Sequence, residues 1–473
     1  MRVYFVGIGG IGMSGVAGLA KSLGFEVWGS ERGPLHPPSS EILKILNIPV
    51  LEPRKENIHS LKPHFLVVGN TISRDHPEIE EAFKLNLPLL SFPDFIKCYL
   101  LPERESLVVA GTHGKTTSSA LLAHILKDLG EGVTFLVGGM LNNFQRNYHF
   151  EQGKWLVLEG DEYPSAFFDI KAKFLHYEPY GLILTSLEFD HGDVYKDIFS
   201  LKEAFGDLLK RVKRRGIVVY NEEDPNLKEI ISLAPQNFRK VSYGIDKGDY
   251  KLVEYKSLFV DGVFQTQCLA EDPQGERFSF QHQLLGLHNS LNILSVIALM
   301  ENLGFDRTRI LQAIKRFKGV KRRQEIIFYN ERVCLIDDFA HHPTAVTITL
   351  REIQKAINPS QTILFFEPRT NTSKRKIFQE EYLKALHSAD IVFLKIPPNL
   401  DKIPLQDRID LEYIVKNLKV RGREAFILDG RNFLNNLRAL PPKSLIIFMS
   451  SVYMEEEIKK VLTFLEGNEE GTF

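Results

Sequence analysis

Short runs of apolar residues recur along the whole chain, and most are followed by a turn and then a stretch with helical spacing. Uninterrupted apolar runs are typical of strands that are buried on both faces of a parallel sheet. The runs that we interpret as such strands are residues 3–6, 65–68, 107–110, 155–158, 182–184, 217–220, 333–336, 363–366, 391–394 and 445–449. Their alternation with helical stretches predicts an α/β protein with mostly parallel sheets.

Three segments interrupt this alternation. Residues 102–105 consist of a proline followed by three charged residues, and we interpret them as a linker. Residues 318–323 form a basic stretch that we interpret as a hinge. Residues from about 238 to 280 show short β-rich runs with turn signals, which predicts an antiparallel extension of the central sheet. At about 150 residues per domain, 473 residues suggest three domains. We expect a Rossmann-like N-terminal domain, a central P-loop-type ATPase domain and a Rossmann-like C-terminal domain, at residues 1–103, 104–319 and 320–473.

The segment after the strand at residues 107–110 has the layout of a phosphate-binding loop. It reads Gly111-Thr112-His113-Gly114-Lys115-Thr116-Thr117 and leads into a helical pattern that stops at Gly130. Glycines let backbone N–H groups approach phosphate oxygens, and the helix N-terminus adds partial positive charge. Lys115 supplies a full charge, and the Thr116 hydroxyl is suited to bind Mg²⁺. The loop departs from the general pattern because Val109 stands where that pattern has a glycine.

A second glycine-rich loop follows the first strand and reads Gly7-Ile8-Gly9-Gly10-Ile11-Gly12. With the acid Glu31 at the end of the next strand, it fits the G-x-G-x-x-G fingerprint of a nucleotide or diphosphate site. The pattern does not specify a dinucleotide. Glycines that serve only close helix–strand packing are the alternative interpretation.

Polar clusters follow several of the predicted strands. Glu159 ends one strand and His191 follows another, which makes both candidates for a metal site, although His191 could equally be a capping or packing histidine. Asn289 and Asn292 lie three apart at a helix start, where amides can pair with an adenine edge or merely cap the helix. Ligands of parallel α/β sheets collect at the carboxyl ends of strands. This shared position turns scattered polar residues into one candidate site.

Composition narrows the class of protein. The net charge of −1 gives no reason to expect nucleic acid or an anionic membrane as a partner. Three widely spaced cysteines argue against a disulfide framework and a zinc site. The N-terminus lacks a signal-peptide pattern, and no apolar stretch is long enough to span a membrane. We therefore expect a soluble cytoplasmic enzyme, as a monomer or homodimer.

Together these motifs resemble the Mur ligase family, the ATP-dependent amide-forming enzymes of peptidoglycan assembly, over nearly the whole chain. The family's phosphate loop has the short Gly-Thr-x-Gly-Lys-Thr form found here. The resemblance implies ATP and Mg²⁺ as cofactors, and it assigns roles to particular residues. Catalytic roles fall to Lys115, Glu159, His191 and His341, and metal binding to Thr116, Glu159 and His191. The implied ATP site comprises residues 111–117 together with His288, Asn289, Asn292, Arg323 and Asp338.

The resemblance also implies two further substrates. A UDP-sugar, UDP-N-acetylmuramate, is expected at Gly7, Gly9, Gly10, Ile11, Gly12 and Ser30. Residues 159–177 and 367–372 are similar to members that attach the tripeptide L-alanyl-γ-D-glutamyl-meso-diaminopimelate in peptidoglycan recycling, which assigns Arg369 and Asn371 to the peptide. Residues 450–454 replace a glycine-rich loop of the family and leave L-alanine open as the alternative amine.

Assignment to another class of protein would account for fewer of these motifs. A nicotinamide oxidoreductase would use the loop at residues 7–12 but leave the lysine-containing loop idle. A P-loop regulatory ATPase would use Lys115 but not the N-terminal loop. A non-catalytic binding protein would have no use for Glu159 and His191 beside the phosphate loop.

Overall fold

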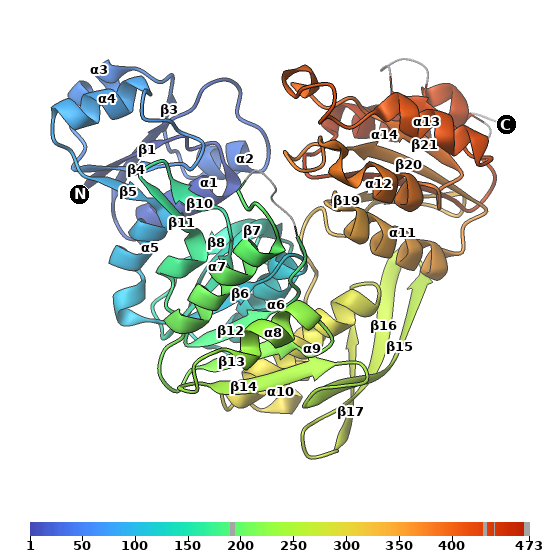
Figure 1. Cartoon of the computed structure of the whole chain (residues 1–473), viewed down its shortest axis with the longest axis horizontal. Helices are drawn as coiled ribbons and strands as arrows, with labels where there is room; N and C mark the ends of the chain where they lie inside the picture. Colours follow the sequence, from blue (N-terminus) through green and yellow to red (C-terminus); the bar gives the residue numbers. More distant parts are fainter. Residues whose placement is uncertain (190–193, 429–432, 439, 468–473) are drawn as a thin grey trace.

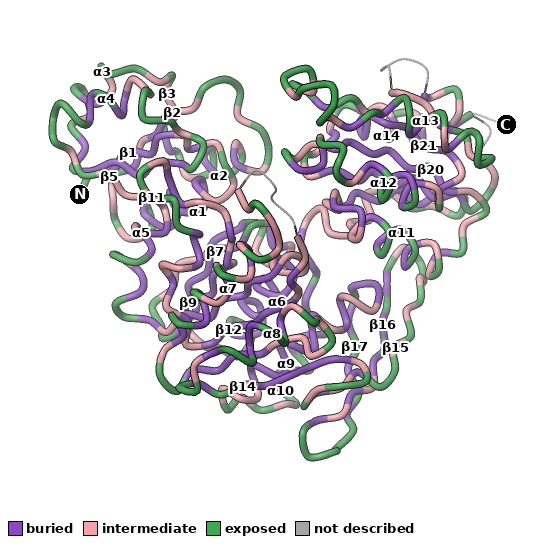
Figure 2. The backbone as a smooth tube through the Cα atoms, viewed as in Figure 1, coloured by how far each residue is buried: buried purple, intermediate pink, exposed green. Residues whose placement is uncertain are grey.

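The computed structural model describes residues 1–189, 194–428, 433–438 and 440–467. It contains three α/β units, and each is built around its own sheet. In Figure 1 the N-terminal unit lies at the upper left and the C-terminal unit at the upper right, and the central unit lies below and joins them. Figure 2 shows that the strands form the buried interior while the loops carry most of the exposed residues.

The N-terminal unit holds a five-stranded parallel sheet of order β3-β2-β1-β4-β5. Its strands are β1 (Arg2–Val6), β2 (Glu26–Ser30), β3 (Val50–Leu51), β4 (Phe65–Val68) and β5 (Leu89–Ser91). Its helices are α1 (Ile11–Ser22), α2 (Ser39–Ile45), α3 (Lys55–Leu61), α4 (Pro77–Lys84) and α5 (Phe92–Tyr99). The predicted Rossmann-like arrangement is confirmed.

The central unit holds a ten-stranded mixed sheet of order β17-β16-β15-β14-β13-β12-β6-β9-β7-β8. Neighbouring strands from β15 through β7 pair in parallel, and the pairs at both ends are antiparallel. The sheet strands are β6 (Glu105–Ala110), β7 (Val133–Leu141), β8 (Arg146–His149), β9 (Trp155–Gly160), β12 (Gly181–Leu184), β13 (Ile217–Asn221), β14 (Arg239–Gly244), β15 (Tyr250–Val260), β16 (Val263–Glu271) and β17 (Arg277–His282). The predicted antiparallel extension is confirmed for the pairs that β16 makes with β15 and β17. It is wrong for β14, at the start of the predicted segment, because β14 pairs in parallel with both β13 and β15.

The helices of the central unit cover both faces of this sheet. They are α6 (Lys115–Asp128), α7 (Ile198–Arg211), α8 (Pro225–Ser232), α9 (Leu287–Asn302) and α10 (Arg307–Lys315). A separate hairpin, β10 (Pro164–Ala166) and β11 (Asp169–Ala172), leads into the 3₁₀ turn η2 (Lys173–His176). The 3₁₀ turn η1 (Leu101–Glu103) lies between α5 and β6.

The C-terminal unit has a six-stranded sheet of order β18-β19-β23-β20-β21-β22, in which only the β18 pairing is antiparallel. Its strands are β18 (Glu325–Tyr329), β19 (Val333–Asp338), β20 (Gln361–Glu367), β21 (Ile391–Leu394), β22 (Glu424–Ile427) and β23 (Ser444–Ser450). Its α-helices are α11 (Pro343–Ile357), α12 (Gln379–Leu386), α13 (Leu411–Val420) and α14 (Glu455–Gly467). Its 3₁₀ turns are η3 (Lys376–Phe378), η4 (Leu400–Lys402) and η5 (Phe433–Leu437).

The two outer units join the central unit in different ways. Helix α1 packs on β7 and β8, and one apolar cluster contains Val16 and Leu19 of α1 with Leu136 and Tyr148 of these strands. The C-terminal unit has its own apolar clusters, to which the long β15–β16 hairpin contributes Phe264. Figure 1 shows this hairpin reaching toward α11. None of the described helices combines the length and apolar character needed to cross a membrane.

Candidate active site

The loop between β6 and α6 is shaped by close contacts that only glycine allows. Gly114 has φ +80°, and a Cβ there would lie 2.5 Å from Oδ1 of Asn292 on α9. A larger residue would therefore be strained by its backbone and would collide with α9. The N-terminus of α6 and the loop backbone are thus held directly beside α9.

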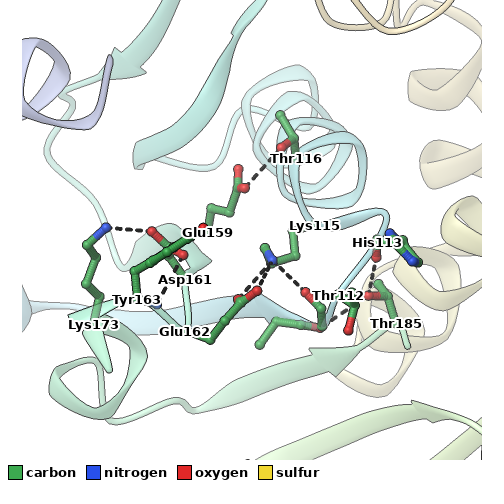
Figure 3. A network of polar contacts seen from close by, with 12 residues as sticks. Thr112, His113, Lys115, Thr116, Glu159, Asp161, Glu162, Tyr163, Lys173 and Thr185 are labelled. Carbon is green, nitrogen blue, oxygen red and sulfur yellow. Dashed lines mark hydrogen bonds and ion pairs between the residues drawn. The ribbon is translucent and has the colours of Figure 1, made fainter. Parts of the chain in front are cut away.

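Lys115, the first residue of α6, is held by an acidic segment at the end of β9 (Figure 3). Its Nζ donates to both carboxylate oxygens of Glu162, at 3.0 and 2.9 Å, and to the Gly111 carbonyl at 2.6 Å. Burial by itself lowers the pKa of this lysine, but the charges of Glu162, Asp161 and Glu159 outweigh it and raise the pKa. Lys115 is therefore a stable cation inside the site.

Thr116 and Glu159 form a pair of oxygen donors next to this cation. The Thr116 hydroxyl donates to Glu159 Oε1 at 3.0 Å, and the Gly138 N–H donates to Glu159 Oε2 at 2.7 Å. Burial raises the pKa of Glu159, against the opposing effects of Lys115 and of the Gly138 N–H. A half-buried carboxylate beside a hydroxyl fits a hard cation such as Mg²⁺, which takes oxygen ligands. His191, the third predicted metal residue, lies outside the described residues.

Helix α9 supplies one wall of the site through its first turns. Asn289 donates through Nδ2 to the Leu285 carbonyl at 2.9 Å and to Gln324 Oε1 at 3.0 Å. Burial lowers the pKa of His288 to about 4, and its buried Nδ1 has no hydrogen-bond partner among the described residues. A neutral histidine with an unpaired nitrogen suits a nucleotide base better than it suits a phosphate.

The C-terminal unit contributes the opposite wall. Arg323 Nη2 lies 3.3 Å from the Thr116 hydroxyl, and its guanidinium stacks 4.5 Å from the Phe339 ring centroid. Asp338 at the end of β19 accepts the N–H groups of Gln324 and Ala340, each at 2.7 Å. Burial raises the pKa of Asp338. These contacts hold the linker between the two units against the phosphate loop.

These walls enclose a cavity of about 350 Å³ between the central and C-terminal units. Most of the ATP-site residues that the sequence suggested line it, as do Glu159 and His341. Those ATP-site residues are Thr112, His113, Gly114, Lys115, Thr116, Thr117, His288, Asn289, Asn292, Arg323 and Asp338. Gly111 instead turns its carbonyl to Lys115. Residues more than 200 positions apart in sequence therefore meet in one cavity, as Thr116 and Arg323 do.

A second cavity of about 300 Å³ lies in the N-terminal unit, at the carboxyl ends of β1 and β2. Gly7 and Ser30 line it, together with Glu31, Arg32 and His76. The Gly9 N–H donates to Glu31 Oε2 at 2.6 Å, and Gly10 caps α1. Ile11 and Gly12 begin that helix. Of the predicted UDP-sugar residues only Gly7 and Ser30 line the cavity, and Gly9, Gly10, Ile11 and Gly12 do not.

The two predicted peptide residues lie at the end of β20. Arg369 Nη1 donates to Glu367 Oε1 at 3.0 Å, and a third of its side chain is exposed. Asn371 is exposed, and neither residue lines the large cavity, although Thr370 between them does. Lys374 is close enough for burial and the charge of Arg369 to lower its pKa. Two cationic side chains and the acid Glu367 therefore lie close to Thr370.

The structure adds residues that sequence reasoning had not assigned. Glu188 exchanges backbone hydrogen bonds with the Thr112 hydroxyl, and its carboxylate lies 3.0 Å from His113 Nε2. A hydrogen bond from Thr344 of the C-terminal unit reaches the same carboxylate. Lys173 pairs with Asp161. Their position in the sequence could have identified two of them, since Asp161 and Glu188 both belong to acidic clusters that directly follow predicted strands.

Comparison with known proteins identifies the family. The chain matches the models described as Mur ligase family, catalytic domain, over residues 2–101 and Mur ligase middle domain over residues 109–300. It is 33% identical over 401 residues to UDP-N-acetylmuramate–L-alanyl-γ-D-glutamyl-meso-2,6-diaminoheptandioate ligase of Escherichia coli K12, covering 85% of this chain and 86% of that protein.

Two further proteins are similar over even more of the chain. UDP-N-acetylmuramate–L-alanine ligase of Carboxydothermus hydrogenoformans is 29% identical over 461 residues, covering 95% of this chain and 94% of that protein. The crystal structure of UDP-N-acetylmuramate–alanine ligase from Thermotoga maritima matches with a TM-score of 0.81 at 26% identity, covering 99% of this chain and all of that one. With its three-unit fold and these matches, the chain belongs to the Mur ligase family of ATP-dependent acid–amino acid ligases.

Proposed function

We propose that the protein joins the carboxylate of UDP-N-acetylmuramate to the amine of L-alanyl-γ-D-glutamyl-meso-diaminopimelate, at the expense of ATP, in peptidoglycan recycling. The observation that carries this proposal is the pair of cavities. One lies at a glycine loop, and the other is formed by Lys115, Thr116 and the C-terminal wall. A ligase of this kind needs separate sites for an acid-bearing nucleotide sugar and for ATP.

In this proposal each of the three units binds a different substrate. Residues 1–103 hold the UDP-sugar, with its diphosphate at the glycine loop and the α1 N-terminus. Residues 104–319 hold ATP, and residues 320–473 bring the amine. We infer that the enzyme works in the cytoplasm, where nucleotide-linked precursors are available.

The first step transfers the γ-phosphoryl group to the sugar's carboxylate. A carboxylate oxygen attacks the γ-phosphorus, the bond to the ADP oxygen breaks, and an acyl phosphate forms. Lys115 holds the phosphoryl oxygens in line for this displacement, and Arg323 approaches them from the other wall. Thr116 and Glu159, with His191, would hold Mg²⁺, which neutralises charge on these oxygens when it is bound.

The second step forms the amide. The amine nitrogen attacks the acyl carbon, the C–O bond to phosphate breaks, and inorganic phosphate leaves. His341, which lines the cavity on the C-terminal side, is in reach of this region and is our candidate to take up the amine proton. When the C-terminal unit closes over the bound substrates, it excludes water, which would otherwise hydrolyse the acyl phosphate.

The peptide is the favoured amine for two reasons. The E. coli relative that the chain resembles at 33% identity carries a tripeptide in its name. Arg369 also lies next to Thr370, which lines the cavity, and a guanidinium suits a peptide carboxylate through a bidentate pair.

The alternative is L-alanine. The Thermotoga maritima alanine ligase matches the fold closely, and the Carboxydothermus hydrogenoformans alanine ligase matches over a longer part of the chain. Phosphate release from ATP, measured with UDP-N-acetylmuramate and either L-alanine or the tripeptide, decides between the two. We expect the tripeptide to give the higher kcat/KM, and a clear preference for L-alanine would overturn the peptide assignment.

A further inference from the structure

Lys173 is a buried lysine outside the predicted catalytic set. It is the first residue of η2, directly after the β10–β11 hairpin, and it is only 7% exposed. Its Nζ lies 2.6 Å from Asp161 Oδ2. Lysines are rarely buried to this extent unless their charge is paired, so the position requires an anion beside Nζ.

On one side Lys173 touches the N-terminal unit, next to the end of its glycine loop. Its Nζ lies 5.2 Å from the ring centroid of Phe92, the first residue of α5. The same ring lies 3.6 Å from the position of a Cβ at Gly12. Only one aromatic ring therefore separates the ammonium group from the last glycine of the loop.

On the other side Lys173 touches the acidic segment of the ATP cavity. Its partner Asp161 lines that cavity, and the adjacent Glu162 holds Lys115. Figure 3 shows Lys173 and Lys115 reaching this segment from opposite sides. The chain of contacts from Gly12 through Phe92, Lys173 and Asp161 thus runs from the start of α1 to the acidic segment of the ATP cavity.

We propose that Lys173 binds the lactyl carboxylate of UDP-N-acetylmuramate and guides it to the γ-phosphate of ATP. The inference rests on the proposed function, which requires this carboxylate to pass from the glycine loop to Lys115. A carboxylate that loses water beside a triphosphate needs a compensating cation. Lys173 supplies it on the connecting path, and Asp161 keeps the ammonium group paired until the substrate carboxylate replaces or joins it.

The test compares two ligands that differ in this carboxylate. UDP-N-acetylglucosamine has the same nucleotide and sugar but no lactyl group. Calorimetric titration of each ligand is made with the wild-type chain and with Lys173→Met, Lys173→Arg and Lys171→Met. Lys171 is the matched control because it is an exposed lysine on β11. Thermal melts of all four proteins check that they fold.

We expect Lys173→Met to weaken UDP-N-acetylmuramate binding about tenfold or more, as for loss of a charged hydrogen bond, with less than about a twofold change for UDP-N-acetylglucosamine. Lys171→Met should leave both affinities unchanged, and Lys173→Arg should restore part of the loss. Equal weakening of both ligands, or no weakening of either, would overturn the proposal.

The variant Asp161→Asn distinguishes a role of Lys173 in substrate binding from a purely structural role in its ion pair with Asp161. This variant keeps Lys173 but removes its present partner. A structural role predicts that Asp161→Asn reproduces Lys173→Met for both ligands, which would overturn the proposal, and this comparison holds even if Lys173→Met does not fold. We expect Asp161→Asn to keep the preference for UDP-N-acetylmuramate. A wild-type chain that binds neither ligand would refute the proposed function itself.

Discussion

The two interfaces of the central unit differ in chemistry. Toward the N-terminal unit, helix α1 makes a close apolar contact, because Gly18 lies directly against the Tyr148 ring, and Val16 and Leu19 share a core with β7 and β8. Toward the C-terminal unit the contacts around the cavity are polar, such as Arg323 to Thr116. A shared apolar core fixes two units to each other, whereas polar contacts around a cavity can break and form again.

Glu188 illustrates the polar interface. Its carboxylate accepts a hydrogen bond from His113, which together with the charge of His342 and a hydrogen bond from Thr344 lowers the pKa of Glu188 against the effect of burial. His113 belongs to the phosphate loop, and Thr344 to the start of α11. The phosphate loop and the C-terminal unit are thus linked through one side chain. This arrangement favours a C-terminal unit that closes on bound ATP while the N-terminal unit stays in place.

Loss of Lys115 should have the largest effect. In Lys115→Ala we expect phosphate release in the complete reaction to fall by about a thousandfold or more, because a cation at the transferred phosphoryl group is lost. UDP-sugar binding, which depends on the N-terminal unit, should persist. The variant also leaves buried Glu162 without its partner, so Lys115→Ala/Glu162→Gln is the control that restores the fold without activity. Retained turnover in Lys115→Ala would contradict the assignment.

Arg323 tests the polar interface. Arg323→Ala should reduce kcat/KM for ATP by about 10- to 100-fold, since one charged contact between the two walls disappears. Titration with the UDP-sugar should give an unchanged affinity. Lys318→Ala, which removes an exposed charge from the same linker, is the matched control and should behave like wild type. Equal loss of UDP-sugar affinity in Arg323→Ala would remove the distinction between the interfaces.

Gly18 tests the apolar interface. A Cβ at Gly18 would overlap the Tyr148 ring, so Gly18→Ala should lower the free energy of unfolding by about 1–3 kcal/mol. Gly206→Ala is the control, because apart from its chain neighbours and the adjacent backbone of α7 no heavy atom of the described residues lies within 4 Å of the corresponding Cβ position. The control should gain about 0.5–1 kcal/mol from helix propensity. Denaturant titration measures both, and a stabilised Gly18→Ala would show that α1 is not tightly docked.

The smallest effect concerns an ionic contact elsewhere between the N-terminal and central units. His176 of η2 lies between Asp94 of α5, at 3.4 Å, and Asp169 of β11, at 2.7 Å. Burial opposes ionisation, but hydrogen bonds from His176 and Ser91 hold the pKa of Asp94 at about 2. The lowered pKa of Asp94 stabilises the folded state at pH values above 3.8, the ordinary pKa of an aspartate. This contribution is lost as the pH falls through about 2.

We therefore expect Asp94→Asn to lower the free energy of unfolding by about 1 kcal/mol or less at pH 7, where partial solvent exposure weakens the contact. The difference from wild type should shrink below pH 4 and vanish near pH 2. Denaturant titrations across this range measure it. A difference that stays constant with pH would show that Asp94 acts by packing and not by charge.

The local features of this chain follow from its sequence because they depend on neighbouring residues. Apolar runs produced β1, β6, β9 and β12 where predicted, and Gly130 follows the end of α6. The mixed central sheet was only partly predictable, since the β-rich composition of residues 238–280 indicated antiparallel strands but not that β14, the first of them, continues the parallel part of the sheet.

Contacts between distant segments were not predictable in the same way. The pairing of Lys173 with Asp161, and its approach to Phe92, require the N-terminal unit to dock beside β9. No local pattern encodes that docking. Gly18 resembles any small residue on a buried helix face until Tyr148 is seen against it. The predicted roles of the site residues, including His191, stay predictions, and the Lys115 and Arg323 variants above test two of them.

The central claim is that the sugar's carboxylate attacks ATP to form an acyl phosphate, and that an amine then displaces phosphate from the acyl carbon. We would label the carboxylate of UDP-N-acetylmuramate with oxygen-18 and supply ATP, Mg²⁺ and the tripeptide. Mass spectrometry of the inorganic phosphate then follows the label. We predict one oxygen-18 atom in each phosphate released, with an equal amount of UDP-N-acetylmuramoyl-tripeptide. Unlabelled phosphate, or phosphate released at the same rate without the UDP-sugar, would contradict the account.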